Sequence, residues 1–278
     1  MTPIRCASAL AIAVMLAASA ATAQQPERPS AELDENRLAR AVQNPISKLG
    51  ALPVQNQAEL GIGPFNRVRN TLSILPMIGF ALSRDVSIVS RTKLPFVSRP
   101  EVDRESGSTS GLGDVTQSLF VIPDSSSGLV WGVGPSFLLP TASSVELGSG
   151  KLGVGPTAAA LARPRPWSFG AVVGQMWSVA GPSNRADVSQ LSVMPLVSVQ
   201  FPSGWYVTTA PIITANWNAA AARSVWTVPL GGACGKVLVV GRLPINISVG
   251  AYWNVIRPDT AFAPTATAEL QVALLFPR

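Results

Sequence analysis

The sequence has no histidine and only two cysteines. The absence of histidine excludes Ser-His-Asp catalysis, Cys-His catalysis and every histidine-bound metal site. Cys6 lies within the first 23 residues, which we interpret below as a removable leader. Cys234 is then the single cysteine of the mature chain, so an intramolecular disulfide bond is excluded. We expect no enzyme, no cofactor and no metal site.

Charged side chains are also scarce. They make up 13% of the chain, against roughly 25% in ordinary soluble domains. The balance is basic, with 21 lysines and arginines against 15 acidic residues, but the basic residues are scattered singly along the chain. Without a basic stripe, nucleic acid is not an expected partner. Much of the surface must face something other than water.

Residues 1–23 are typical of a secretory signal peptide. Arg5 gives a basic start, residues 7–20 are mostly apolar, and Ala21-Thr22-Ala23 forms a small-x-small cleavage site. The apolar run is short for a membrane helix and polar sequence follows it at once, so a retained anchor is the weaker interpretation. We expect the chain to be exported through this leader.

The remaining chain lacks the apolar stretch of about 20 residues that a membrane-spanning helix requires. Residues 204–222 are uncharged throughout, but the stretch contains several polar residues and Pro211 would break a helix there. The hydrophobic pattern has a period of two instead. Trp205 and Val207 share one face, and Tyr206 and Thr208 share the other. This alternation predicts strands with one apolar and one polar face.

The same alternation recurs along the chain. It is cleanest in residues 243–253, and further rows run through residues 72–80, 88–96, 129–139, 167–177, 191–199 and 266–276. Tryptophan or phenylalanine tends to lie at the end of a row, as expected for an aromatic girdle at a membrane interface. The last row ends on Phe276, almost at the C-terminus. This pattern favours a bacterial outer-membrane β-barrel, with Cys234 as a small buried or lipid-facing residue.

We count twelve candidate strands, centred near residues 58, 75, 91, 118, 134, 157, 173, 194, 210, 231, 249 and 270. An even number suits a closed single-chain barrel. Short turns near residues 83–84, 124–128, 163–166, 202–204 and 241–242 alternate with generally longer loops, notably residues 98–112 and 141–150. We therefore predict an all-β fold: an antiparallel transmembrane β-barrel over residues 51–278, with short turns and both termini on the periplasmic side.

Prolines are the main objection to these strands, because proline removes a donor from the hydrogen-bond ladder. We interpret five of them as bulges or kinks: Pro76, Pro135, Pro195, Pro211 and Pro229. A soluble β-sandwich or lipocalin-like barrel is the alternative fold, and it would bury the apolar faces inside. Twelve inward apolar rows would overfill such a core, whereas twelve outward rows suit lipid.

The segment of residues 24–50 differs in character from the strands. Ser30 could cap a short helix that runs through Leu38 and Val42 and ends before Pro45. The pattern leaves two alternatives open. The segment is either a flexible periplasmic lead or a plug that folds into the barrel.

Two short motifs fail on inspection. Ser90-Arg91-Thr92-Lys93 matches S-x-x-K, but residues three apart in a strand point to opposite faces, so the lysine cannot reach the serine. Residues 148–153 match G-x-G-x-x-G, but no helix is expected after them, which favours a glycine-rich loop entering a strand over a nucleotide site. The absence of histidine also argues against the outer-membrane phospholipase and protease barrels.

Several stretches resemble the MetA-pathway phenol-degradation family of outer-membrane proteins. They span residue 44 to the C-terminus and include Leu52-Pro53-Val54-Gln55-Asn56, Gly61-Ile62-Gly63-Pro64, Gly111-Leu112-Gly113-Asp114, Trp131-Gly132-Val133-Gly134-Pro135, Leu147-Gly148-Ser149-Gly150-Lys151, Trp226-Thr227-Val228-Pro229-Leu230 and Leu274-Leu275-Phe276-Pro277. The resemblance implies an outer-membrane barrel that passes or binds hydrophobic or aromatic compounds. It implies no catalytic residues.

Two functions follow as hypotheses. The chain is either a channel or transporter for small hydrophobic or aromatic solutes, or a non-transporting structural barrel with a plugged lumen. Its other expected partners are outer-membrane lipid and the barrel assembly machinery. The residues expected to line the lumen are polar or charged and follow the inward phase of their strands, with Lys151 near the external mouth: Arg91, Lys93, Lys151, Asn216, Asn246, Tyr252, Glu269 and Gln271. We expect the interior charges to pair with one another.

Overall fold

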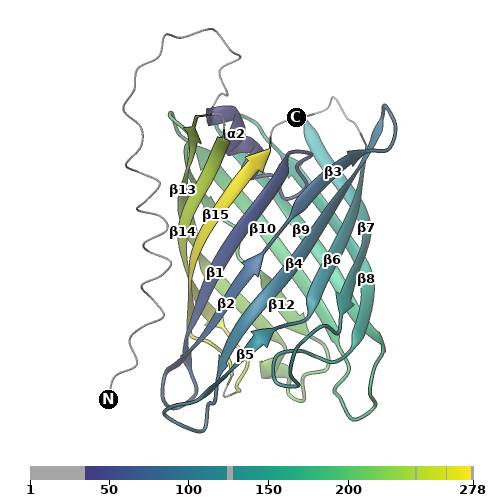
Figure 1. Ribbon diagram of the computed structural model, residues 1–278, viewed down its shortest axis with the longest axis vertical. Helices are drawn as coiled ribbons and strands as arrows, with labels where there is room; N and C mark the ends of the chain where they lie inside the picture. The colour runs from purple at the N-terminus through teal and green to yellow at the C-terminus, as the bar shows by residue number, and fades with distance from the viewer. Residues whose placement is uncertain (1–34, 124–127, 242, 261, 277–278) are drawn as a thin grey trace. The chain divides into compact units, whose positions relative to one another are not determined.

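The computed structural model of the chain describes residues 35–123, 128–241, 243–260 and 262–276. In this part, fifteen strand segments form one antiparallel sheet (Figure 1). They are β1 (Gly50–Ile62), β2 (Arg67–Ile74), β3 (Met77–Ala81), β4 (Val86–Pro100), β5 (Ser108–Leu112), β6 (Val115–Pro123), β7 (Leu129–Leu139), β8 (Leu152–Ala162), β9 (Trp167–Ala180), β10 (Ser189–Gln200), β11 (Trp205–Thr209), β12 (Ile213–Asn216), β13 (Trp226–Val240), β14 (Leu243–Ile256) and β15 (Ala266–Phe276). The predicted signal peptide lies outside the described residues.

Twelve strands cross the sheet, as predicted. The segments β2 and β3 together form one crossing strand, because both pair with β1 on one side and with β4 on the other. The same holds for β5 with β6 and for β11 with β12, which share their neighbours β4 and β10 respectively. Ten of the twelve predicted centres lie within a strand segment, and residues 75 and 210 lie in the short breaks between β2 and β3 and between β11 and β12.

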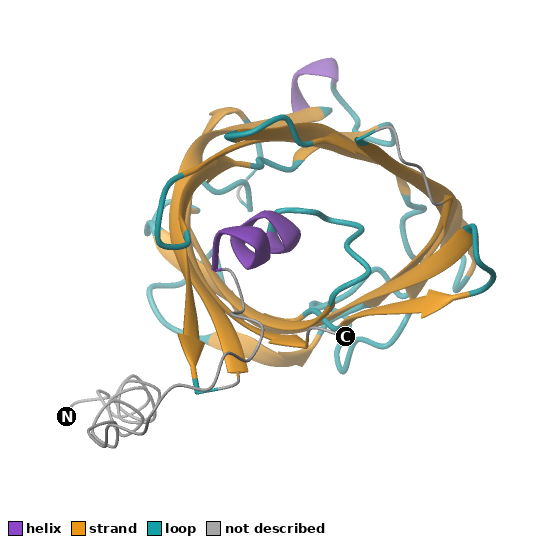
Figure 2. Cartoon of the chain, turned by 90° about the horizontal axis from the view of Figure 1, so that it is seen from above, coloured by secondary structure: helices purple, strands orange, loops and turns teal. Residues whose placement is uncertain are grey.

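The sheet closes on itself. β1 pairs with β15 in continuous register, from Gly50 opposite Phe276 to Leu60 opposite Ala266. Every crossing strand therefore has two neighbours, and the strands form a ring when viewed along the barrel (Figure 2). Closure satisfies the backbone hydrogen bonds that an open edge would leave exposed, and this is the condition for a sheet to sit in lipid.

The apolar rows point outward and the polar rows inward, which confirms the membrane-barrel alternative over a soluble barrel. In β14, Ile247 and Val249 are exposed at 37% and 51%, whereas Asn246 and Ser248 on the other face are buried. In β15, Leu270 and Phe276 are likewise exposed, whereas Ala273 and Leu275 are buried. The outer surface is thus mostly apolar, and we call it the outer wall.

All seven tryptophans are exposed on this outer wall. Trp131, Trp167 and Trp205 stand at the strand ends beside the short turns, whereas Trp177, Trp217, Trp226 and Trp253 stand near the long loops. Two aromatic belts at opposite ends of the strands are the arrangement that anchors a barrel at the two faces of a membrane. Cys234 is exposed on the same wall.

A few polar side chains also face outward, and they bond to one another. Gln117 donates to Ser90 over 2.9 Å and accepts from Thr92 over 2.5 Å. Asn56 and Asn70 exchange amide hydrogen bonds of 2.8 and 3.2 Å. Pairing lowers the cost of placing these groups against an apolar solvent. Ser90 and Lys93 lie on opposite faces of β4, so the S-x-x-K match has no catalytic geometry.

The prolines behave differently from one another. Pro76 and Pro211 interrupt their strands, as predicted, although the register is the same on both sides of each break. Pro229 lies at a register shift between β13 and β14. Pro135 and Pro195 cause no register shift, because β7 pairs with β8, and β9 with β10, without one, so the predicted bulge is absent. On the other side of each proline the pairing is interrupted, between Val133 and Ser136 toward β6 and between Val193 and Val197 toward β11 and β12. At these two positions the sheet tolerates the loss of the backbone N–H donor that proline lacks.

The connections confirm the alternation of short turns and longer loops. The predicted loop over residues 98–112 is shorter than expected, because Ser98 pairs with Ser110 and Pro100 with Ser108, extending β4 and β5. The loop of residues 140–151 has the predicted extent. The glycine-rich motif lies here, as a loop that enters β8.

The helix α2 (Glu35–Val42) and residues 43–49 fold into the short-turn end of the barrel, inside the ring of strands (Figure 2). Leu38 and Ala39 pack against Tyr206, Val237 and Leu275 of the wall. Ile46, on the segment that follows, packs against the apolar cluster of Val89, Phe120, Ile122 and Ala159. Residues 35–49 therefore form a plug inside the barrel and not a flexible periplasmic lead. We call them the plug below.

Candidate functional site in the barrel lumen

Within the described strands, charged side chains reach the lumen from four adjacent crossing strands. Five basic and two acidic residues occupy the inward-facing positions of β15, β1, β2 and β4: Glu59, Arg67, Arg69, Arg91, Lys93, Arg99 and Glu269. In β7 to β14 the single charged residue is Lys236. It faces outward, with its Nζ atom 5.1 Å from the centre of the Trp205 ring. The interior is therefore charged along one side.

The opposite side of the lumen is built from small and apolar side chains. β8, β9 and β10 lie across the ring from β1, as the strand order shows. Their inward positions, together with those of the flanking strands, include Gly134, Gly155, Thr157, Ala159, Val172, Gly174, Met176, Ser192, Met194 and Ala233. Gly155 needs its lack of a side chain, because an added Cβ would meet the carbonyl of Gln175. This wall offers a smooth, uncharged surface.

Glu59 and Arg69 form the central ion pair of the charged side. They stand opposite each other in the β1–β2 pair, and the guanidinium donates through both Nε and Nη2, the second over 2.7 Å to Oε1. This bidentate geometry is the strong form of an arginine–carboxylate contact. Both side chains remain partly exposed, at 27% and 21%, as expected for groups that face an interior containing water.

Lys93 and Glu269 lie near this pair without bonding to each other. Lys93 is within electrostatic range of Glu59, Arg69 and Glu269. Glu269 accepts a long hydrogen bond of 3.3 Å from Gln57 on the adjacent strand. The predicted pairing of interior charges is therefore centred on Glu59 and Arg69, two residues absent from the predicted set.

Arg91 lies closer to the plug than the other interior charges. Its neighbours across the sheet are Met77 and Ser118, and Val89, two residues away in the same strand, contacts Ile46 of the plug. Among the described residues Arg91 has no hydrogen-bond or ion-pair partner. No described residue therefore neutralises its positive charge.

Lys151 is buried at the external mouth and is already paired. Its Nζ atom lies 2.9 Å from Oδ1 of Asp187, in the β9–β10 loop, and the lysine side chain is 7% exposed. The hydrogen bonds from Lys151 and Ser178 lower the pKa of Asp187. Lys151 thus holds a loop in place, which is a different arrangement from a free charge guarding the entrance.

Arginines tie the other external loops together. Arg67 donates to the carbonyls of Arg104 and Gly107 over 2.6 and 2.7 Å. The guanidinium of Arg99 lies 4.1 Å from the centre of the Phe262 ring. Arg185 donates to the carbonyls of Val145, Gly148 and Ser149. These contacts give the mouth a fixed frame around the lumen.

The remaining predicted lumen residues are spread along its length. Asn246 is buried at the level of the plug and accepts a 2.8 Å hydrogen bond from the Tyr206 hydroxyl. Asn216 is exposed at the external end of β12, where its side chain accepts from the backbone of Asn218. Tyr252 and Gln271 are half-buried on the inner faces of β14 and β15. These residues do not form one cluster, and their role in a solute path stays a prediction.

Sequence reasoning missed Glu59, Arg69 and Gln57, although a signal for them was present. Gln55, Gln57 and Glu59 occupy alternate positions in β1, and apart from Asn56 the residues between and beside them are apolar. A short loop at residues 63–66 joins β1 to β2. A tight hairpin there would bring Glu59 opposite Arg69.

Comparison with known proteins gives a fold but no family. No protein-family model matches the chain, and no curated protein matches it in sequence. Among solved structures it is similar to an outer membrane channel from Pseudomonas putida F1, with a TM-score of 0.62 and 15% identity over 82% of this chain and 94% of the other. The chain has the fold of an outer-membrane channel. At this identity the likeness extends to the fold alone.

Two further solved structures resemble the chain only weakly. A bacterial polysaccharide outer membrane secretin aligns at a TM-score of 0.41, with 9% identity over 83% of this chain and 99% of the other. Outer membrane phospholipase A from Escherichia coli aligns at 0.38, with 9% identity over 88% of this chain and 98% of the other. None of the helices in the described residues has the length and hydrophobicity to cross a membrane.

Proposed function

We propose that the chain is an outer-membrane channel for small solutes that combine an apolar, in particular aromatic, body with a polar or anionic end. The observation that supports this most is the division of the lumen. Five basic and two acidic side chains line one side, whereas the facing side is small and apolar. An amphipathic solute can present its polar end to the first and its body to the second. The excess of positive charge favours an anionic end.

Three further observations support this assignment. The aromatic belts and apolar outer wall suit insertion in an outer membrane. The fold is shared with a channel. The sequence resembles the MetA-pathway phenol-degradation family at the stretches quoted above, and that resemblance implies hydrophobic or aromatic cargo.

The alternative of a non-transporting barrel with a plugged lumen is not favoured. The plug lies at one end of the barrel, and the charged lumen beyond it would have no evident use in a purely structural barrel. The absence of enzymatic activity stays an expectation. It rests on the missing histidine and on the likeness to a channel.

The direct test is uptake of benzoate into proteoliposomes that contain residues 24–278. Benzoate carries an aromatic body and an anionic end, and glucose, of similar size but without either feature, is the comparison solute. We expect benzoate to enter faster than glucose, and Arg91→Gln with Lys93→Gln to reduce that preference. Arg84→Gln, in an exposed turn outside the lumen, is the matched control. Equal rates for both solutes in the wild type would contradict the proposed selectivity.

A further inference from the structure

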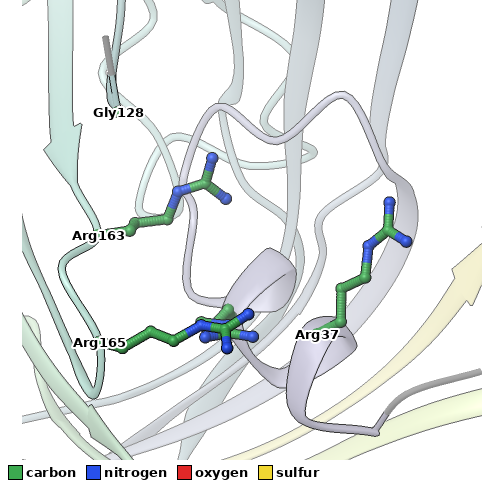
Figure 3. A pocket seen from close by; sticks show the side chains of 5 residues that line it. Arg37, Gly128, Arg163 and Arg165 are labelled. Atoms are coloured by element: carbon green, nitrogen blue, oxygen red, sulfur yellow. The ribbon is translucent and has the colours of Figure 1, made fainter. Parts of the chain in front are cut away.

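Four arginines converge at the short-turn end of the barrel. Arg37 and Arg40 lie three residues apart on α2, a spacing that places them on neighbouring positions of the helix surface. Arg163 and Arg165 belong to the turn between β8 and β9. Together with Gly128 they line one open hollow of about 350 Å³ (Figure 3). The two pairs come from segments more than 120 residues apart in sequence.

None of the four arginines has a hydrogen-bond or ion-pair partner among the described residues. Six other arginines do have such partners, since they donate to carbonyls, hydroxyls or carboxylates, whereas Arg91 in the lumen does not: Arg67, Arg69, Arg99, Arg185, Arg223 and Arg257. Burial and the nearby charge of Arg40 lower the pKa of Arg163. Four like charges therefore gather around a hollow, and no carboxylate of the described residues neutralises them.

We propose that this hollow is an anion site, which binds a phosphate or carboxylate group between the plug and the rim of the barrel. Guanidinium groups recognise such oxyanions through pairs of parallel hydrogen bonds, and several arginines can share one multivalent anion. A bound anion would relieve the mutual repulsion of the four charges. It would also fasten α2 to the β8–β9 turn, because each contributes two of the four arginines.

The required chemistry is a compact group with two or more anionic oxygens. It can come from a free phosphate-bearing or carboxylate solute, or from the headgroup of a phospholipid. Trp167 follows the arginine turn directly and is exposed on the outer wall, so lipid headgroups lie within reach of Arg165. The site is at the opposite end of the barrel from the long loops, and binding there does not depend on conduction through the lumen.

The test is calorimetric titration of pyrophosphate into residues 24–278 refolded in neutral detergent. We expect saturable binding that weakens about tenfold or more in each of two double variants, Arg37→Gln with Arg40→Gln and Arg163→Gln with Arg165→Gln. Each variant removes two guanidinium groups and with them their charge-assisted hydrogen bonds to the anion. Arg84→Gln, an exposed arginine in the β3–β4 turn at the same end of the barrel, is the matched control and should bind as the wild type does.

Heat-modifiable migration on gels identifies folded variants, and titrations are compared only among these. Unchanged binding in both folded double variants, or no pyrophosphate binding by the wild type in low salt, would overturn the proposal. The source of the anion is separated by repeating the titration in nanodiscs with and without phosphatidylglycerol. Weaker pyrophosphate binding in the anionic discs, through competition, indicates a lipid headgroup. Equal binding in both indicates a free anion. Because binding is read without any transport, failure of the channel assignment would not affect this result.

Discussion

At the scale of single residues, the interior charges depend on Glu59. Its carboxylate receives two hydrogen bonds from Arg69 and also lies within electrostatic range of Lys93. The other inward carboxylate, Glu269, has a single long contact with Gln57. Loss of Glu59 would leave two cations without their nearest counter-charge, and uncompensated charges inside a protein are costly.

We therefore expect Glu59→Gln to destabilise the folded barrel by about 1–3 kcal/mol, the usual range for losing a hydrogen-bonded charge. The double change Glu59→Gln with Arg69→Gln should cost less than Glu59→Gln alone, because it removes the orphaned cation as well. Urea unfolding in lipid vesicles gives both values. Glu269→Gln is the control and should cost least. A double variant that is less stable than Glu59→Gln alone would contradict this account.

The same residues show why the site was only partly predictable. Arg91, Lys93, Glu269 and Gln271 follow the inward phase of clear amphipathic strands, so the sequence alone indicates their face. The pairing of Glu59 with Arg69 depends on hairpin register, which periodicity does not give. The arginine cluster around the hollow required the folded chain, because α2 and the β8–β9 turn meet only when the plug enters the barrel.

At the scale of elements, the period-two hydrophobic pattern predicts almost all of the barrel fold. Each predicted strand is present, since a membrane barrel needs an apolar face on every strand and a polar face on most. The errors lie where hydrogen bonding rather than hydrophobicity determines the structure. The β4–β5 hairpin shortens one loop, and Pro135 and Pro195 cause no register shift. The sequence does not decide between a plug and a flexible lead, because an eight-residue helix has too little pattern to show what it packs against.

Strand β15 offers a matched test of the two faces. Leu270 is 42% exposed on the outer wall, and Gln271 is half-buried on the inner face beside Gln55. We expect Leu270→Arg to destabilise the barrel by about 2–4 kcal/mol, because the guanidinium must enter lipid. Gln271→Arg should cost less than half as much, because the side chain stays in a polar interior.

Refolding equilibria in vesicles of fixed thickness provide the comparison for this pair of variants. Similar losses for Leu270→Arg and Gln271→Arg would mean that the two faces of β15 do not differ as the structure indicates. The assignment of inside and outside would then fail for the closing strand.

At the scale of the whole molecule, the described chain combines three parts with separate tasks. A closed apolar wall faces lipid, a lumen charged along one side and apolar along the other extends from the long-loop end, and a plug occupies the short-turn end. A solute path through the lumen requires the plug to leave room or to move. The charge of the path is set by the arginines and lysine of β2 and β4, which outnumber the carboxylates of β1 and β15.

Single-channel recording in planar bilayers tests this account most directly. We expect residues 24–278 to produce discrete conductance steps whose reversal potential under a salt gradient shows a preference for anions. Reversal of two interior charges by Arg91→Glu with Lys93→Glu should shift that potential toward cations, and deletion of residues 24–49 should increase the conductance. No conductance from the wild type, before and after that deletion, would contradict the claim that the lumen is a solute path.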